Sequence, residues 1–362
     1  MIRLPARKDV LRELPGLGMT MALAAAGGLA FAMLGLPVPW ISGSMIVVAA
    51  AALMGAPTIV PRWVREIVFF VLGLNIGSAV TPETIAGIGS WPASIVILIV
   101  ALPILSVSCA VPLVYFRGWS RDDAMLASIP GALSLIMALA DATDADVPRI
   151  ALVQAVRVAI LVALLPPLIS MTSGLDLTMA MPQSELPGLY DLVLLIGLGF
   201  IGVLLMRLAR FPAAGLMGAL IASAALHGTD VVSATLPSEV LMVSFVVLGA
   251  GIGARFAGLG WHNFRAGLFD AAMTFAIGFV VSVLTAIVAT AWLGFPFGQT
   301  ILAFAPGALE VMVVMAFLLG LDAAYVGAHH TVRFLVLVLL APLILRRRPG
   351  KQDETQDPLR GP

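Results

Sequence analysis

Apolar segments follow one another along almost the whole of this chain, and no other feature constrains its fold as strongly. Of the 362 residues, 60% are hydrophobic and 11% are charged, and the mean hydropathy is +1.07. A soluble protein has roughly 25% charged residues, so this chain has too few to cover the surface of a soluble enzyme. We therefore expect a protein that crosses a membrane many times. We distinguish twelve apolar segments, at residues 14–35, 40–55, 64–80, 92–115, 123–141, 150–170, 188–206, 212–228, 237–254, 267–293, 299–320 and 324–345.

These segments are expected to be α-helices. Lipid offers backbone groups no hydrogen-bond partner, and the alternating pattern of a β-barrel is absent from the sequence. The tryptophans lie at or near segment ends, as expected of amphipathic rings at a membrane interface. The basic N-terminus precedes an apolar run that is long for a signal peptide, so we interpret this run as an uncleaved first helix. The predicted fold class is an all-α polytopic membrane protein. The six tryptophans are Trp40, Trp63, Trp91, Trp119, Trp261 and Trp292.

The two halves of the chain resemble each other at a nearly constant spacing along the sequence. Several matches in one order at one spacing indicate a duplication, which is common among secondary transporters. The matched pairs are residues 71–77 (VLGLNIG) with 247–253 (VLGAGIG), 130–133 with 306–309 (both PGAL), Asp146 with Asp322, Arg157 with Arg333, and Pro166 with Pro342.

The positions of the basic residues indicate how the two halves are oriented, because cytoplasmic loops carry an excess of Lys and Arg. If all twelve segments cross, basic residues fall on both sides of the membrane. If segments 123–141 and 299–320 each enter and leave on one side, every basic residue is cytoplasmic except Arg157 and Arg333, which lie within the membrane. We therefore predict two inverted repeats of about five spans each, plus a broken or re-entrant Pro-Gly helix per repeat. The predicted regions are 1–13 (cytoplasmic N-terminal tail), 14–171 (membrane repeat 1), 172–187 (linker), 188–346 (membrane repeat 2) and 347–362 (disordered cytoplasmic tail).

A Pro-Gly pair interrupts one apolar segment of each half, at Pro130 and Gly131 and again at Pro306 and Gly307. Proline removes a backbone donor and clashes with the preceding turn, and glycine permits unusual dihedral angles. Each pair therefore predicts a broken helix whose freed backbone groups must be buried in protein or line a cavity. In transporters such helix ends bind ions or substrate. The alternative is a kink that a neighbouring helix relieves.

Arg157 and Arg333 lie at equivalent places in apolar segments, with Gln154 and His330 three residues earlier on the same helix face. A guanidinium group suits carboxylate or phosphate-like anions, and a nearby His can donate or titrate. One hypothesis is therefore an anion-binding site. The other is that each Arg pairs with a local acid or caps the carbonyl groups of a broken helix.

Glu310 is the clearest acidic residue within an apolar run. Burying its carboxylate costs about 2.5–3.5 kcal/mol on insertion scales, so it is expected to be neutral, and able to carry protons, or paired. Alternatively it reaches the interface or pairs with Arg333. The equivalent residue of the first half, Ser134, can only hydrogen-bond. Asn75, within the 71–77 motif, is a candidate polar ligand if this motif is unwound, whereas close helix packing is the alternative.

Several classes of function lack their sequence signals. The 20 basic and 20 acidic residues cancel, so no bulk attraction to nucleic acid is implied. The single Cys109 and the four histidines form no His-x-x-x-His or Cys/His cluster of the kind that a copper or iron oxygenase needs. No G-x-x-x-x-G-K-[ST] loop is present, so ATP-driven pumping is not expected. We expect no enzyme activity, no catalytic residue, no metal and no cofactor.

Five stretches of the sequence resemble the AbrB membrane-protein family, which is known for a duplicated membrane domain and is unrelated to the soluble DNA-binding regulator of that name. The resemblance extends from about residue 16 to 346. Members of the family are labelled as transporters, regulators of gene expression or ammonia monooxygenases. The family pattern often has an acid two positions after Pro-Gly-x-Leu, where this chain has Leu135 and Val311. The resembling stretches are residues 36–45 (LPVPWISGSM), 71–77, 151–157 (ALVQAVR), 305–309 (APGAL) and 327–333 (GAHHTVR).

Together these features predict a secondary transporter or permease that moves a small anionic or zwitterionic solute by alternating access. The family labels add two alternatives: a membrane-embedded regulator of gene expression that acts through a partner protein, and a membrane monooxygenase, which the sparse histidines disfavour. The predicted binding residues are Pro130, Gly131, Ser134, Gln154, Arg157, Pro306, Gly307, Glu310, His330, Arg333 and Asn75.

The expected location is the inner (plasma) membrane, with multiple spans and both termini cytoplasmic. The expected partners are the lipid bilayer and the small solute, and protons are a candidate coupling ion. A homodimer is a candidate assembly, and no direct contact with nucleic acid is expected.

Overall fold

The computed structural model describes residues 7–80, 82–130, 145–173, 188–229, 231–232 and 235–344. Within these ranges the protein consists of helices and their connections, with no β-strand. Six stretches are long and apolar enough to cross a membrane, which confirms the predicted class of all-α polytopic membrane protein. Two predicted site residues, Gly131 and Ser134, lie outside the described residues. The predicted C-terminal tail and most of the predicted linker also lie outside them. The six stretches are Glu13–Met33, Thr84–Arg117, Val147–Met171, Leu189–Leu208, Ser238–Phe256 and Gly260–Leu293.

The helices of the two halves have matching bounds. The pairs α2 and α10, α3 and α11, and α6 and α13 have 15, 16 and 8 residues per helix, respectively. Their first residues keep the spacing of the matched motifs. The elements are α1 (Arg7–Met33), α2 (Pro39–Leu53), α3 (Arg62–Gly77), α4 (Pro82–Gly87), η1 (Ile88–Ser90), α5 (Trp91–Arg117), α6 (Arg121–Ser128), α8 (Val147–Ser173), α9 (Leu189–Leu208), α10 (Ala214–Gly228), α11 (Ser238–Gly253), η2 (Ala254–Phe256), α12 (Gly260–Leu293), α13 (Phe297–Phe304), α14 (Leu309–Leu318) and α15 (Ala323–Ile344).

Glycine and serine define the helix ends next to the two short helices α6 and α13. Gly118 ends α5 and Gly294 ends α12, both in the left-handed region at φ 66° and 74°, which glycine adopts without steric cost. Ser120 caps α6 by accepting a hydrogen bond from the amide of Asp123 at 3.0 Å. The chain therefore turns sharply from each long helix into the short helix that follows.

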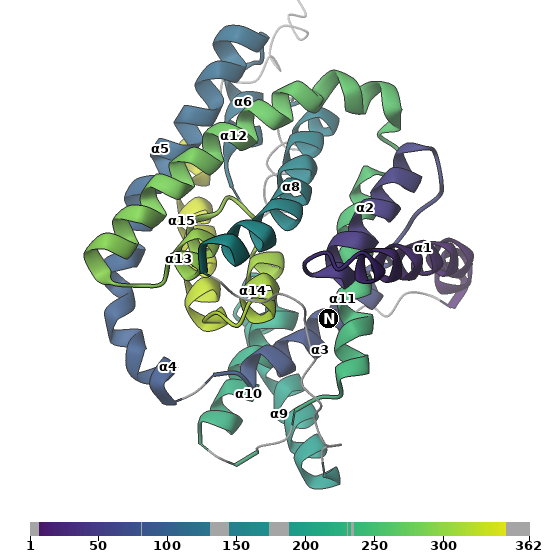
Figure 1. Cartoon of the computed structure of the whole chain (residues 1–362), viewed down its shortest axis with the longest axis vertical. Coiled ribbons are helices and arrows are strands. Elements are labelled where there is room, and N and C mark those ends of the chain that lie inside the picture. The colour runs from purple at the N-terminus through teal and green to yellow at the C-terminus, as the bar shows by residue number, and fades with distance from the viewer. Residues whose placement is uncertain are drawn as a thin grey trace, which may run out of the picture.

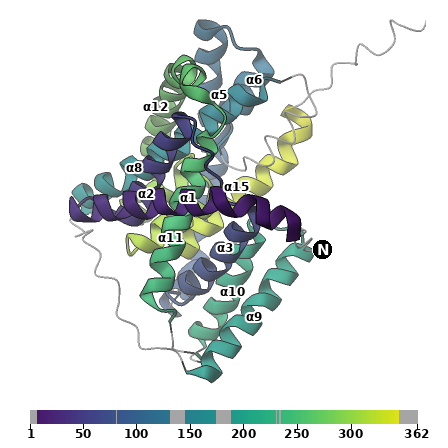
Figure 2. The same ribbon diagram turned by 90° about the vertical axis from the view of Figure 1, so that its right-hand side faces the viewer.

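The helices form two groups, each of which draws on both halves of the chain. Bundle 1 contains α1–α3 and α9–α11, and bundle 2 contains α5, α6, α8 and α12–α15. The helices within each bundle contact one another extensively, and contacts between the bundles are sparse. Bundle 2 occupies the upper left of Figure 1 and bundle 1 the lower right, and the two short helices α13 and α14 lie near the centre. Figure 2 shows α1 crossing the face of the molecule and α9 at the edge of bundle 1.

Bundle 1 is held together by close backbone contacts at glycines. A Cβ atom built on Gly73 of α3 would lie 2.4 Å from the carbonyl oxygen of Leu216 in α10, and one built on Gly249 of α11 would lie 2.4 Å from that of Ile41 in α2. These glycines belong to the 71–77 and 247–253 motifs, which lie in continuous helices. Close helix packing therefore accounts for both motifs.

We expect Gly73→Ala to destabilise the protein by about 1–3 kcal/mol, because its methyl group would force the backbones of α3 and α10 apart. The measurement is the thermal unfolding midpoint of the purified protein in detergent. Gly197→Ala in α9 is the matched control, since a Cβ atom there meets nothing within 4 Å. Equal midpoints for the two variants would contradict this account of the packing.

Candidate functional site

The first element of the candidate site is a break between two short helices of bundle 2. Helix α13 ends at Phe304 and α14 begins at Leu309, with Pro306 and Gly307 between them. The residue before the proline, Ala305, is extended at φ −55° and ψ 141°, as expected for a residue that precedes proline. The chain is buried from Ala305 to Gly307. The second-half Pro-Gly pair therefore interrupts a helix inside the protein.

The first half matches this arrangement as far as its proline, at the end of α6. This helix ends at Ser128, Ile129 is extended at φ −62° and ψ 123°, and the buried Pro130 follows. The described residues stop there and resume at residue 145, so Gly131 and Ser134 are not placed. Both predicted Pro-Gly sites thus begin where a short helix ends, with free carbonyl groups at its C-terminus.

Two polar side chains of α8 bind the carbonyl groups at the end of α6. Gln154 Nε2 donates to the carbonyl oxygens of Leu126 and Ile129, both at 3.0 Å. Arg157 donates to the carbonyl oxygen of Ile129 at 3.1 Å, and more weakly to that of Ala127 at 3.4 Å. Arg157 also donates to the Gln154 amide oxygen. The two predicted site residues therefore act together as a cap on this helix end.

The end of α13 is capped in the same way by α15. Arg333 donates to the carbonyl oxygens of Ala305 at 2.7 Å and of Ala303 at 2.8 Å. His330 Nε2 donates to that of Leu302 at 3.0 Å. The capped carbonyl groups of the two halves occupy equivalent positions of the repeat. The pairs are Leu126 with Leu302, Ala127 with Ala303 and Ile129 with Ala305.

The two guanidinium groups are buried without an acidic partner. Arg157 and Arg333 are each 2% exposed, and no described carboxylate lies within 4 Å of either. The Nε atom of each has no hydrogen-bond partner among the described residues. The C-terminal dipoles of α6 and α13 offset part of the charge, and the two guanidinium groups repel one another. Among the described residues the charge of the two guanidinium groups is therefore only partly compensated.

Glu310 lies in the first turn of α14, directly after the break, and is partly buried. Among the described residues no ion pair within 4 Å joins it to Arg333. Its carboxylate instead attracts Arg255, which lies in η2 directly after α11. The N-terminus of α14 has no side-chain cap, so the positive end of its dipole also faces the break.

Asn75 lies apart from this capping network. It is 4% exposed within α3, and its carbonyl oxygen accepts a hydrogen bond from Ser78 Oγ at 2.7 Å. No hydrogen bond described for Asn75 joins it to either break.

Sequence reasoning missed a second polar cluster, centred on Asp270 of α12. This carboxylate is 1% exposed and accepts hydrogen bonds from Trp119 Nε1 and from Arg149, both at 2.9 Å, and from Arg117. The Arg149 guanidinium also lies over the Trp119 ring at 3.9 Å. The available signal was an acid near the start of an apolar segment. Among the described residues no group of three or more His, Cys, Asp or Glu side chains is arranged to hold a metal ion.

The fold and the site define a polytopic helical membrane protein in which buried arginines cap the ends of two short helices, α6 and α13. The chain belongs to the AbrB family, since the family model described as "Transition state regulatory protein AbrB" matches residues 40–348. It is 24% identical to "Uncharacterized protein YhjN" of Bacillus subtilis (strain 168), over 93% of this chain and 94% of that protein. It is also 24% identical to "Putative regulator AbrB" of Escherichia coli (strain K12), over 91% of this chain and 95% of that protein.

We expect Asp270→Asn to destabilise the protein by about 2–4 kcal/mol, because it leaves Arg117 and Arg149 beside a neutral amide. The value lies below that of a fully buried pair because both arginines are 37% exposed. The measurement is the unfolding midpoint in detergent. Asp122→Asn, an exposed position in the first turn of α6, is the control and is expected to change stability by less than about 1 kcal/mol. A similar fall in the unfolding midpoint of both variants would contradict a stabilising role for the Asp270 cluster.

Proposed function

We propose that this protein is a secondary transporter or permease for a small anionic or zwitterionic solute, and that it works by alternating access. One observation carries the proposal: two buried guanidinium groups cap the ends of α6 and α13 with no carboxylate within 4 Å among the described residues. A buried charge without a counterion is unfavourable, and an anionic solute between the breaks would supply that counterion.

The contacts at the ends of the broken segments support an arrangement of two inverted repeats, each with about five spans and one re-entrant broken helix. Arg117 and Arg149 flank the first broken segment and bind the same carboxylate, as expected if this segment enters and leaves on one side. Phe295 and Tyr325 flank the second segment, and their ring centroids lie 4.9 Å apart. These contacts agree with the topology that keeps basic residues on the cytoplasmic side.

The hydrogen-bond donors of the capping network also support the binding of an anion. Because the carbonyl groups hold each guanidinium group in one orientation, a solute would meet donors that are already positioned. The unpartnered Nε atoms of Arg157 and Arg333 and the uncapped N-terminus of α14 offer further donors. A carboxylate or phosphate-like group has the charge and the acceptors to match them.

The sparse contacts between the bundles support alternating access. Both breaks and both arginines belong to bundle 2, so a shift of this bundle against bundle 1 would carry the whole site with it. Such a shift requires few contacts to be remade.

A regulatory role is the second candidate, favoured by the name of the Escherichia coli relative, "Putative regulator AbrB". A regulator of this kind would act through a partner protein, which affinity purification from native membranes would identify. Recovery of the protein without any stoichiometric partner would count against this candidate.

Transport is tested with the purified protein in liposomes and a panel of labelled carboxylates, amino acids and phosphate. We expect uptake of at least one solute, and a loss of at least tenfold in Arg333→Met with partial retention in Arg333→Lys. Arg265→Met, at an exposed position near the start of α12, is the control and should transport normally. A thermal shift of each variant by the solute separates lost binding from misfolding. Absence of any flux, or normal flux in Arg333→Met, would overturn the proposal.

Proton coupling is tested at Glu310, whose carboxylate interacts with Arg255 of η2. An inward proton gradient is expected to accelerate uptake in the wild type several-fold and to have no effect in Glu310→Gln, which cannot release a proton. Glu239→Gln, an exposed acid in the first turn of α11, is the matched control and should respond like the wild type. If Glu310→Gln still responds to the gradient, Glu310 does not carry the proton.

A further inference from the structure

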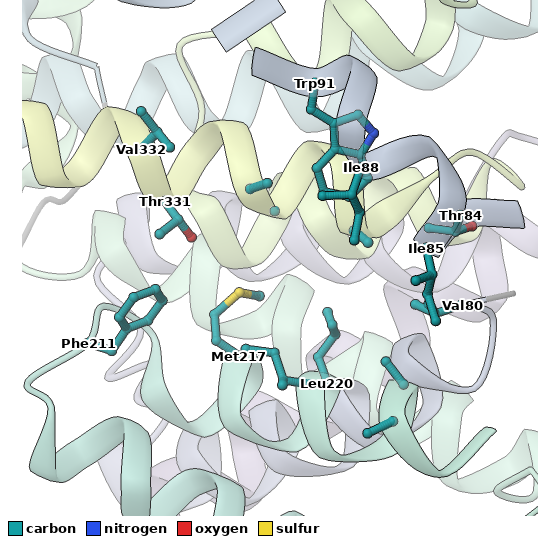
Figure 3. A pocket seen from close by; sticks show the side chains of 16 residues that line it. Val80, Thr84, Ile85, Ile88, Trp91, Phe211, Met217, Leu220, Thr331 and Val332 are labelled. Atoms are coloured by element: carbon teal, nitrogen blue, oxygen red, sulfur yellow. The ribbon is translucent and has the colours of Figure 1, made fainter. Parts of the chain in front are cut away.

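The boundary between the two bundles contains an apolar crevice of about 440 Å³. Helix α10 of bundle 1 lines one side and α15 of bundle 2 the other, while α4, η1 and the start of α5 close one end. Figure 3 shows Met217 and Leu220 of α10 on one side of the crevice and Thr331 of α15 and Trp91 on the other, with Ile85 toward one end. The crevice is separate from the capped breaks, since none of the capping side chains lines it.

The walls of the crevice are almost entirely hydrocarbon. Among its described lining residues, only Thr84, Thr331 and the indole of Trp91 bring polar side-chain atoms. An ordered water needs two to four polar partners, and apolar cavities of this kind stay dry. Water is therefore a poor occupant of this space.

The crevice is continuous with the surface that faces lipid. Ile85, Ile88 and Ile221 line it and are 47%, 47% and 49% exposed. Large apolar side chains of the spanning helices continue this surface, for example Val96 of α5 at 59% exposed. The hydrocarbon of the bilayer therefore reaches the mouth of the crevice directly.

We propose that one acyl chain of a membrane phospholipid occupies this crevice and bridges the two bundles. An apolar chain matches the walls, and it replaces an empty space that would cost the lining side chains their dispersion contacts. The bound chain touches α15 at Thr331 and Val332, directly beside His330 and Arg333, which cap the second break. Lipid binding here does not depend on transport, so it can be tested whether or not a solute is known.

The test uses Trp91 as a reporter, because its ring lines the crevice. The full chain is reconstituted in phosphatidylcholine that carries bromine atoms near the middle of one acyl chain, and in the same lipid without bromine. The fluorescence of Trp91 is the difference between the wild type and Trp91→Phe. We expect brominated lipid to quench this difference by more than half, because a bromine atom in the crevice lies against the indole ring.

Variants that fill the crevice separate a bound chain from bulk lipid at its mouth. Ala328→Phe on α15 and Ala224→Phe on α10 each place a ring inside the crevice and are expected to reduce the quenching of Trp91 at least threefold. Two variants from opposite walls keep the test valid if one fails to fold. Val243→Phe, on an exposed position of α11 that does not line the crevice, is the matched control and should leave quenching unchanged.

Two results would overturn the proposal. Quenching that persists in both filled variants would mean that the bromine atoms act from bulk lipid. Quenching of Trp91 by acrylamide in the aqueous phase, without quenching by brominated lipid, would mean that the crevice is open to water and holds no acyl chain.

Discussion

Backbone carbonyl groups released by a helix break are the constraint on which the rest of this structure depends. In the membrane no water can bind them, and each unsatisfied group costs several kcal/mol. The described ends of α6 and α13 meet this demand with Arg157 and Arg333, whose planar guanidinium groups bind several carbonyl oxygens at once. A residue with a single donor could not close these ends alone. The buried arginines are therefore required by the breaks before any role in binding is considered.

The same arrangement leaves an excess of positive charge at the capped helix ends. Each cap brings a full positive charge, whereas a helix C-terminus supplies about half an elementary negative charge. Because no described carboxylate lies within 4 Å, the rest of the positive charge on each guanidinium group has no counterion. The preference for anions that we propose would thus have its origin in the capping of these helix ends. Capping and binding are consequently not competing interpretations of Arg157 and Arg333, because the cap fixes the orientation in which each group would meet a solute.

How far the sequence could predict this structure depends on how local each signal is. The PGAL motifs and the equivalent arginines lie in short patterns at one spacing. The break between α13 and α14 was predicted from these motifs, and the capping of carbonyl groups was one of the hypotheses for the arginines. The Asp270 cluster could not be inferred in this way, because Arg117 and Arg149 lie 153 and 121 residues away along the chain. The crevice could not be predicted from the sequence either, because apolar side chains line the crevice and apolar side chains also face lipid. The sequence thus predicted the breaks but not the long-range pairing around them.

The two ends of bundle 2 use equivalent positions for different chemistry. Near Asp270 three charged groups and an indole form one hydrogen-bonded cluster, whereas the equivalent positions of the other half hold neutral and aromatic residues, with Ser94 bound to His329 at 2.9 Å and Tyr325 against Phe295. The ionic cluster weakens with salt because its arginines are partly exposed, while ring packing does not. Opening one end therefore costs a different free energy from opening the other. In the transporter that we propose, this difference between the two clusters would give the two orientations of the protein unequal populations. The paired positions are Asp270 with Ser94, Trp119 with Phe295, and Arg149 with Tyr325.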